Sequence, residues 1–272
     1  SLNFKNRSTC YIYIMLRQFV KYHGTGNDFI LFSGNYKGLS VSKIKNLCDR
    51  KLGIGADGLM CVENIENSNL DFMIHFFNSD GKLGTLCGNG SRCAVKYAHS
   101  KGFFIGDSCN FKASDGIHQG LLMQDDLVSI NFLNCTKAAK SSSGYLINTG
   151  SPHYVEITEN LSKIRITDVG PVVSKKVDPL NGCNVNFIEA MENDEFQIMT
   201  YERGVEMETL SCGTGAVAGA LVLNQSKGIQ SPIRLRAKGG VLTVEFSVSE
   251  LGFENIILTG SVVKVFNGEC II

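Results

Sequence analysis

Residues 86–92 read LCGNGSR, and residues 211–217 read SCGTGAV. In each stretch a cysteine is followed by a glycine, a small polar residue and a second glycine. The two cysteines, Cys87 and Cys212, lie 125 positions apart in a chain of 272 residues. A turn of the same composition that occurs twice predicts that the fold contains two copies of one structural unit.

The segments around the two cysteine turns also correspond, and they do so in the same order. Both turns lead into stretches that end in Ser-Lys-Gly. The corresponding segments are 24–31 with 148–157, 76–86 with 200–211, 87–102 with 212–228, and 110–116 with 234–240. Four ordered matches indicate two halves of one design.

Periodicity predicts both strands and helices in this chain. Stretches 71–79, 239–248 and 254–266 are rich in aromatic or alternating apolar residues, which is typical of strands. Residues 91–101 fit a helix that ends before Gly102, and the stretch 39–53 fits a short amphipathic helix with Val41, Ile44 and Leu47 or Cys48 on one face. We therefore predict an α+β fold of two pseudo-symmetric, similar domains. Each is a mixed or antiparallel sheet around a central helix, with the active site in the cleft between them.

The expected domain boundaries follow from the repeat. Residues 15–131 form the N-terminal half, to which residues 261–272 are expected to return, and residues 132–260 form the C-terminal half. A linker is expected near 132–145, where the residues are small and polar. Residues 1–14, before Met15, are interpreted as a leader or a non-native extension.

Composition argues against several classes of function. The 26 basic and 26 acidic residues balance, without a basic stripe, so neither nucleic acid nor a membrane is expected as a partner. The longest apolar run, 216–223, is far shorter than a membrane span. The ten cysteines are scattered, without the spacing of a zinc site, which favours a reduced, cytoplasmic protein and predicts no metal.

A cysteine at the start of a helix has a specific chemistry. The positive end of the helix dipole favours thiolate over thiol and also binds anions, so the pKa of such a thiol is expected to fall toward neutrality. Two such turns facing each other could hold a carboxylate. One thiolate would remove the α-proton and the opposite thiol would return a proton to the other face, while N–H groups stabilise the carbanion. This chemistry requires no cofactor.

Other interpretations of the cysteines remain open at this stage. Cys87 and Cys212 could form two structural turns or a redox pair, and a thiol redox or metal-binding module is the non-enzyme alternative. The remaining cysteines, including Cys93, are interpreted as packing residues, because free cysteine behaves as a small hydrophobe.

Four ordered motifs resemble those of the diaminopimelate epimerase family: KYHGTGNDFI (21–30), FNSDGKLGTLCGNGSRC (77–93), GSPHYV (150–155) and YERGVEMETLSCGTGA (201–216). The resemblance extends from about Met15 to the C-terminus. It implies a small-molecule substrate and the interconversion of LL- and meso-2,6-diaminopimelate in lysine and peptidoglycan precursor synthesis. It also implies that neither pyridoxal phosphate nor a metal takes part, and it leaves a homodimer open.

The resemblance assigns roles to individual positions. Cys87 and Cys212 correspond to the acid–base pair, and His153 and Glu202 to residues that tune it. The positions that correspond to substrate-binding residues are Asn27, Asn78, Gly88, Asn89, Ser151, Asn184, Glu202, Arg203, Gly213 and Thr214.

Two positions depart from the family pattern. Ser151 stands where many members have asparagine, and Gly58 where some have glutamine. The rival enzyme class is a related cofactor-independent racemase of the proline racemase type. Arg203, Asn78 and Asn184 favour the longer diacid substrate.

Overall fold

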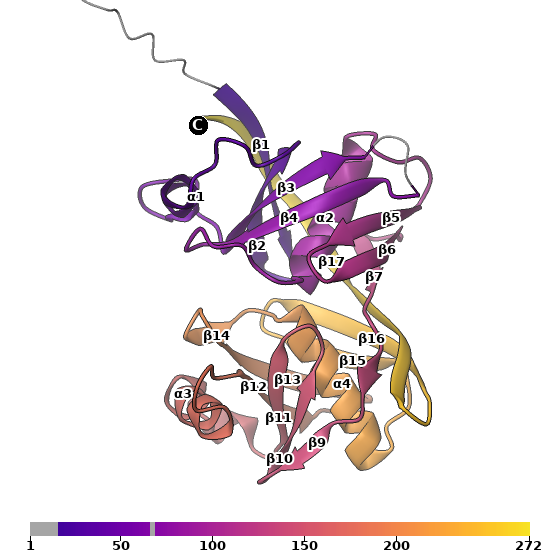
Figure 1. The fold of residues 1–272 in the computed structure, drawn as a ribbon. Coiled ribbons are helices and arrows are strands. Elements are labelled where there is room, and N and C mark those ends of the chain that lie inside the picture. Colours follow the sequence, from indigo (N-terminus) through magenta and orange to yellow (C-terminus); the bar gives the residue numbers. More distant parts are fainter. Residues whose placement is uncertain (1–15, 66–68) are drawn as a thin grey trace, which may run out of the picture.

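The computed structural model describes residues 16–65 and 69–272, so the stretch interpreted as a leader lies outside the described residues. Its fold is two-domain-like, with strands closed into barrels and few helices (Figure 1). Within the described ranges no helix is both long and apolar enough to cross a membrane.

The first half contains seven strands and part of an eighth. They are β1 (Leu16–Gly24), β2 (Asn27–Ser33), β3 (Gly58–Asn64), β4 (Phe72–Asn78), β5 (Ser108–Ala113), β6 (Gly116–Leu122), β7 (Leu127–Asn131) and part of β17 (Gly252–Ile271). Each strand pairs with the next in this order, and β17 pairs with both β7 and β1, which closes the ring. Two of these pairs, β2–β3 and β4–β5, are parallel.

The second half repeats the mixture of parallel and antiparallel pairs. Its strands are β8 (Cys135–Thr136), β9 (Ala139–Ser141), β10 (Gly144–Asn148), β11 (Pro152–Ile157), β12 (Asn184–Ala190), β13 (Glu195–Glu202), β14 (Met207–Thr209), β15 (Ile233–Ala237) and β16 (Gly240–Val248). The parallel pairs are β11–β12 and β13–β15. The segment expected to be a linker, 132–145, instead contributes β8 and β9, because its backbone pairs with β17 and β10.

Strand β17 belongs to both halves. Its first part pairs with β16, with Leu258 opposite Val244. Its last part pairs with β1, with Ile271 opposite Leu16. In Figure 1 it therefore runs from the lower half into the upper one.

Two helices carry most of the buried helical surface. Helix α2 (Gly88–Ser100) contacts β1–β4, β6, β7 and β17, and helix α4 (Gly213–Lys227) contacts β10–β13 and β15–β17. Cys87 is the N-cap of α2 and Cys212 that of α4. Helix α4 is apolar nearly all round, which suits a fully buried position, whereas α2 buries polar residues such as Asn89 and Arg92 along with its apolar ones.

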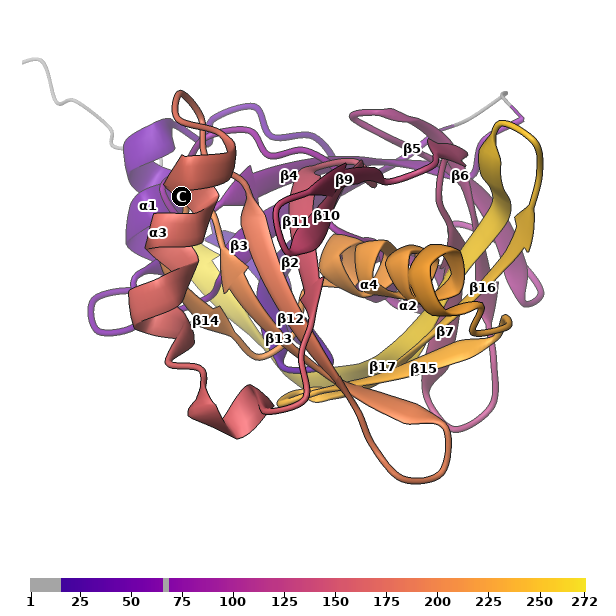
Figure 2. The same cartoon turned by 90° about the horizontal axis from the view of Figure 1, so that it is seen from below.

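The other helices are shorter or more peripheral. Helix α1 (Val41–Cys48) lies within the stretch 39–53 in which a short helix is predicted, and it is capped by the Ser40 hydroxyl, which accepts from the Lys43 N–H. The 3₁₀ turn η1 (Leu161–Lys163) precedes α3 (Ile166–Val177), which packs on β12 and β13. Figure 2 shows α3 on the outer side of these strands, away from α4.

Candidate active site

The two cysteine turns meet where the two halves come together. A Cβ atom placed on Gly213 would lie 3.1 Å from Gly88 Cα and 3.3 Å from Asn89 N. Side chains at either glycine would therefore push the two helix N-termini apart. The repeated glycine after each cysteine allows this close approach of the two backbones.

A cavity of about 270 Å³ lies over the two turns and contains both thiols. Its lining includes every site residue predicted from the sequence except His153. These residues are Asn27, Asn78, Cys87, Gly88, Asn89, Ser151, Asn184, Glu202, Arg203, Cys212, Gly213 and Thr214. A larger cavity, of about 580 Å³ beside Cys109 and Ser129, contains none of them, so we take the smaller cavity as the site.

The pKa values of the two thiols differ from the prediction made from the sequence. The Cys87 sulfur accepts from the Gly90 N–H at 3.4 Å, yet burial raises the pKa of Cys87 to about 12. Burial and the nearby Glu202 carboxylate also raise the pKa of Cys212. The expectation of a pKa near neutrality was wrong, because desolvation of the sulfurs outweighs the helix N-termini.

Glu202, at the end of β13, is one of two acidic residues that line the cavity, the other being Asp57. Burial raises the pKa of its carboxyl group to about 7, and the negative charge of Asp57 contributes in the same direction. Thr209, whose hydroxyl oxygen is buried, also lines the cavity. Sequence reasoning missed Thr209 because threonine next to a strand end is common.

Glu202 should make the folded state less stable as the pH rises. Its pKa is higher in the folded protein than in the unfolded chain, so unfolding releases a proton between about pH 4.5 and pH 7. Across that window the free energy of unfolding should fall by up to about 3 kcal/mol. Glu202→Gln should remove this fall. Urea unfolding at pH 5 and pH 7 measures the change in unfolding free energy in the wild type and in Glu202→Gln. An equal change in both proteins would contradict the raised pKa of Glu202.

His153 lies behind the cavity wall on β11. Burial lowers its pKa to about 4, so the imidazole is neutral at pH 7. Nδ1 lies 2.7 Å from Asn186 Oδ1, an acceptor, which leaves Nε2 to accept from Thr214 Oγ1 at 3.0 Å. Thr214 Oγ1 in turn lies 3.3 Å from the Cys212 sulfur. A chain of polar contacts therefore joins Cys212 to the imidazole.

Arg203 and Asn184 lie together at one side of the cavity. Asn184 Oδ1 accepts from the Arg203 backbone N–H at 2.9 Å, and the guanidinium donates to Gly182 O at 3.2 Å. No carboxylate among the described residues forms an ion pair with Arg203. Its remaining N–H groups are therefore free to bind an anion in the cavity.

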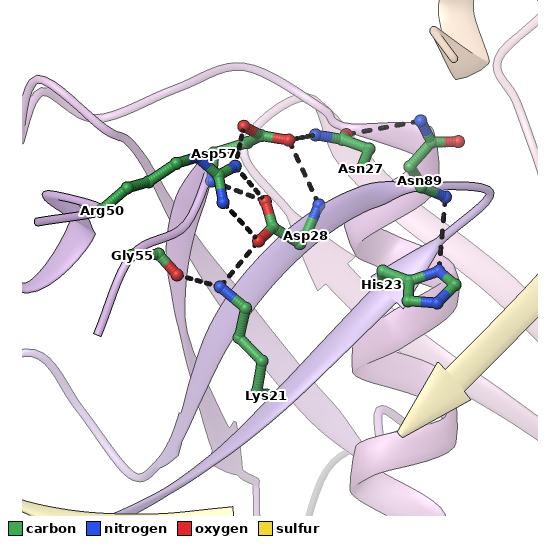
Figure 3. A network of polar contacts seen from close by, with 9 residues as sticks. Lys21, His23, Asn27, Asp28, Arg50, Gly55, Asp57 and Asn89 are labelled. Atoms are coloured by element: carbon green, nitrogen blue, oxygen red, sulfur yellow. Dashed lines mark hydrogen bonds and ion pairs between the residues drawn. The ribbon is translucent and has the colours of Figure 1, made fainter. Parts of the chain in front are cut away.

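Asn27 is held by a charged network on β1, β2 and the loop before β3 (Figure 3). Its side-chain amide donates to Asp57 Oδ2 at 2.8 Å, and its Oδ1 accepts from Asn89 Nδ2 at 3.3 Å. Arg50 bridges Asp57 and Asp28, each at 2.7 Å. Asp57 lines the cavity but was not predicted from the sequence, because the family pattern singles out its neighbour Gly58.

The two departures from the family pattern have distinct structural settings. A Cβ atom on Gly58 would lie 2.6 Å from the Phe76 ring, so this backbone has no room for a side chain. Ser151 Oγ contacts His153 Nε2 at 3.0 Å and accepts from Asn184 Nδ2 at 3.1 Å. Ser151 therefore links His153, which lies behind the cavity, to Asn184, which lines it.

The described residues contain no cluster of three or more histidine, cysteine or acidic side chains that could hold a metal ion. The polar groups of the cavity include two thiols, amides, hydroxyls, two carboxyl groups and a guanidinium. This set suits a small substrate that carries both carboxylate and ammonium groups.

Solved structures with the same fold include epimerases. A hydroxyproline epimerase from Agrobacterium vitis matches with a TM-score of 0.72 at 13% identity, over 94% of this chain and 93% of that one. A PhzF-family phenazine biosynthesis protein from Bacillus anthracis matches with a TM-score of 0.73 at 15% identity, over 95% and 100%. Both matches extend over nearly the whole chain and show that it has the same fold.

The particular family follows from sequence comparison. The sequence model of diaminopimelate epimerase matches residues 19–129 and 145–265. The diaminopimelate epimerase of Flavobacterium psychrophilum is 39% identical over 251 residues, which cover 90% of this chain and 97% of that one. The enzyme of Aquifex aeolicus is 36% identical over 275 residues, 92% and 96% respectively. The chain belongs to the diaminopimelate epimerase family.

Proposed function

We propose that this enzyme interconverts LL- and meso-2,6-diaminopimelate by a two-base mechanism at Cys87 and Cys212. The main support for this proposal is that the two cysteine turns lie in close contact and that both cysteines line one cavity. A planar carbanion presents two equivalent faces, so an acid and a base of the same kind on opposite sides suit its inversion.

The proposed architecture is pseudo-symmetric. Residues 15–131 with 261–272 make one half around α2, residues 132–260 make the other around α4, and the substrate lies in the cleft between them. The ring of strand pairs in the first half and the contacts of both helices support this division.

Each turnover moves one proton off the α-carbon and another one on. One cysteine, as thiolate, takes the α-proton, and the electron pair left on carbon spreads into the substrate carboxylate. The turns at Gly88–Asn89 and Gly213–Thr214 direct helix N-termini at this growing negative charge. The opposite thiol then donates its proton to the other face of the carbon and becomes the thiolate.

The first thiolate needs a proton acceptor, because burial keeps both thiols protonated. The chain from Cys212 through Thr214 to His153 supplies one. The Nε2 lone pair of the neutral imidazole faces the Thr214 hydroxyl, so this path can carry the thiol proton to the ring. The low pKa of His153 leaves the ring neutral at pH 7, but it also makes the imidazole a weak base, so the transfer from the buried thiol is uphill.

The rest of the substrate requires groups that match its distal amino-acid end. Arg203 can hold a carboxylate by two parallel hydrogen bonds, assisted by Asn78 and Asn184, and Glu202 can accept from an ammonium group. These residues favour the diacid over a proline-like substrate, for which a distal clamp would have no partner. The meso product is a precursor of lysine and peptidoglycan.

An exchange assay in heavy water tests the proposal. With LL-diaminopimelate we expect loss of the α-proton NMR signal together with formation of the meso isomer. Proline or hydroxyproline should exchange far more slowly under the same conditions. Exchange of proline but not of diaminopimelate would favour the racemase alternative, and absence of exchange with bound zinc would favour a metal-binding module.

Arg203→Lys should weaken substrate binding rather than the chemistry. Lysine keeps the charge but loses the planar pair of donors that a carboxylate prefers. We expect KM to rise by roughly 10- to 100-fold, equivalent to about 1.5–3 kcal/mol, with a smaller change in kcat. Steady-state kinetics measure this, with Arg165→Lys on the exposed start of α3 as the matched control. Unchanged KM and kcat would make Arg203 a bystander.

A further inference from the structure

Arg92 is a fully buried arginine on α2, one turn after Cys87. No acidic side chain within residues 16–65 and 69–272 forms an ion pair with it. Burial lowers its pKa to about 10, so the guanidinium still carries its charge at pH 7. Removing an arginine from water without an acidic partner is costly, which calls for a reason in this position.

The guanidinium makes its hydrogen bonds to the turn that follows Cys87 and to Thr25. Nη2 donates to Asn89 Oδ1 at 2.9 Å and to Thr25 Oγ1 at 3.2 Å, and Nη1 donates to Gly88 O at 3.2 Å. Gly88 and Asn89 are the first two residues after Cys87. Arg92 therefore fixes the orientation of the Asn89 side chain, because an amide oxygen that accepts leaves its nitrogen to donate elsewhere.

Asn89 passes this constraint to the other turn. Its Nδ2 donates to Ser211 Oγ at 2.9 Å and to Ser211 O at 3.2 Å, and Ser211 directly precedes Cys212. Thr25 Oγ1 also lies 2.8 Å from Ser211 Oγ. The four side chains of Thr25, Asn89, Arg92 and Ser211 are at most 2% exposed. They form a closed polar link between the turn of Cys87 and the turn of Cys212.

The backbone around this link is shaped to accommodate it. A Cβ atom on Gly260 would lie 2.9 Å from Arg92 Nη2, and one on Gly24 would lie 2.8 Å from Asn89 O. Thr25 has a positive φ of 49°, which a β-branched residue rarely adopts unless its surroundings fix it. The space left by these two glycines and the backbone conformation of Thr25 thus both accommodate the arginine and its partners.

We propose that Arg92 is a positioning residue that, through Asn89 and Ser211, holds the two cysteine turns in register and keeps its buried positive charge behind Cys87. The inference rests on the two-base function proposed above. Inversion needs each sulfur on its own side of one α-carbon, so a small shift between the turns separates acid from base. The charge of Arg92 opposes that of Glu202, whose negative charge disfavours a thiolate at Cys87.

Two variants separate the two roles of the arginine. Arg92→Lys keeps a charge but cannot reach Gly88 O, Asn89 and Thr25 together, so we expect kcat to fall about ten-fold with KM changed much less. The reactivity of Cys87 toward iodoacetamide, followed by peptide mapping across pH, should stay near that of the wild type. In Arg92→Met the alkylation of Cys87 at pH 8 should also slow about ten-fold, because a nearby cation favours the thiolate.

Arg165→Met is the matched control, since the Arg165 side chain is 82% exposed and pairs with Asp168 rather than with either cysteine turn. The Arg165→Met variant should change neither kcat nor the rate at which Cys87 is alkylated. Wild-type kcat in Arg92→Lys, with unaltered Cys87 alkylation in Arg92→Met, would overturn the proposal. If Arg92→Met does not fold, as judged by circular dichroism, kcat of Arg92→Lys decides alone. A wild-type enzyme without epimerase activity would defeat the proposed function, whereas the alkylation comparison would still test the charge of Arg92.

Discussion

Replacing either Cys87 or Cys212 by alanine is expected to lower epimerisation by about 10³-fold or more, because each face of the carbanion then lacks its own proton carrier. Both thiols line the same cavity, and neither has a neighbouring cysteine that could substitute for it there. The loss should appear in kcat in both directions of the reaction. Chiral analysis of the two isomers over time measures it.

Cys61→Ala is the control for a change at a cysteine outside the cavity. Cys61 is fully buried on β3 and packs in the core beneath α1, so its removal should affect stability more than turnover. We expect activity within a few-fold of the wild type. Near-normal turnover by the Cys87 or the Cys212 variant would rule out the two-base mechanism.

Oxidation is expected to abolish activity completely by joining Cys87 to Cys212. Both are free thiols, and their turns abut at Gly88 and Gly213. A disulfide needs Cα atoms roughly 4.4–6.8 Å apart, so a modest closure would suffice. Because burial raises the pKa of both thiols, the rate of inactivation should climb as the pH rises above 8, where the thiolate fraction increases. A thiol reductant should restore activity.

Bound substrate should protect the pair, since it fills the space between the sulfurs. Peptide mapping of the inactive protein should recover a Cys87–Cys212 link, whereas Cys93 and Cys109, both buried, should stay reduced. Inactive protein with both thiols free, or inactivation at the same rate with saturating substrate, would show that the two sulfurs do not face each other across the substrate.

The positions of elements near the repeated turns could be predicted from the sequence. The short helix within 39–53 and the strands at β4 and β16 follow from local periodicity, which short-range contacts preserve. Cys87 and Cys212 follow from the repeated turn, but the other ten predicted residues that line the cavity came from motif resemblance, because their gathering depends on long-range pairing that no local pattern contains.

Other features depend on burial, which a sequence does not display. Arg92 reads as an ordinary polar helix position, yet both α2 and its arginine are enclosed by strands. The pKa of the thiols was misjudged for the same reason, since the helix N-terminus is visible in the pattern but the desolvation of Cys87 is not. The segment 132–145 looked irregular because its strands are short and at an edge, with Thr136 paired only to β17.

The passage of β17 through both halves has a consequence for biosynthesis. Leu16 pairs with Ile271, 255 positions later, so β1 has to wait for almost the whole chain to leave the ribosome before this partner exists. The N-terminal barrel cannot close until β17 has been made, even though its first seven strands emerge early. Until then the edges of β1 and β7 are unpaired, and such edges attract other chains. Dependence on chaperones in the cell should therefore be concentrated in the half that is made first.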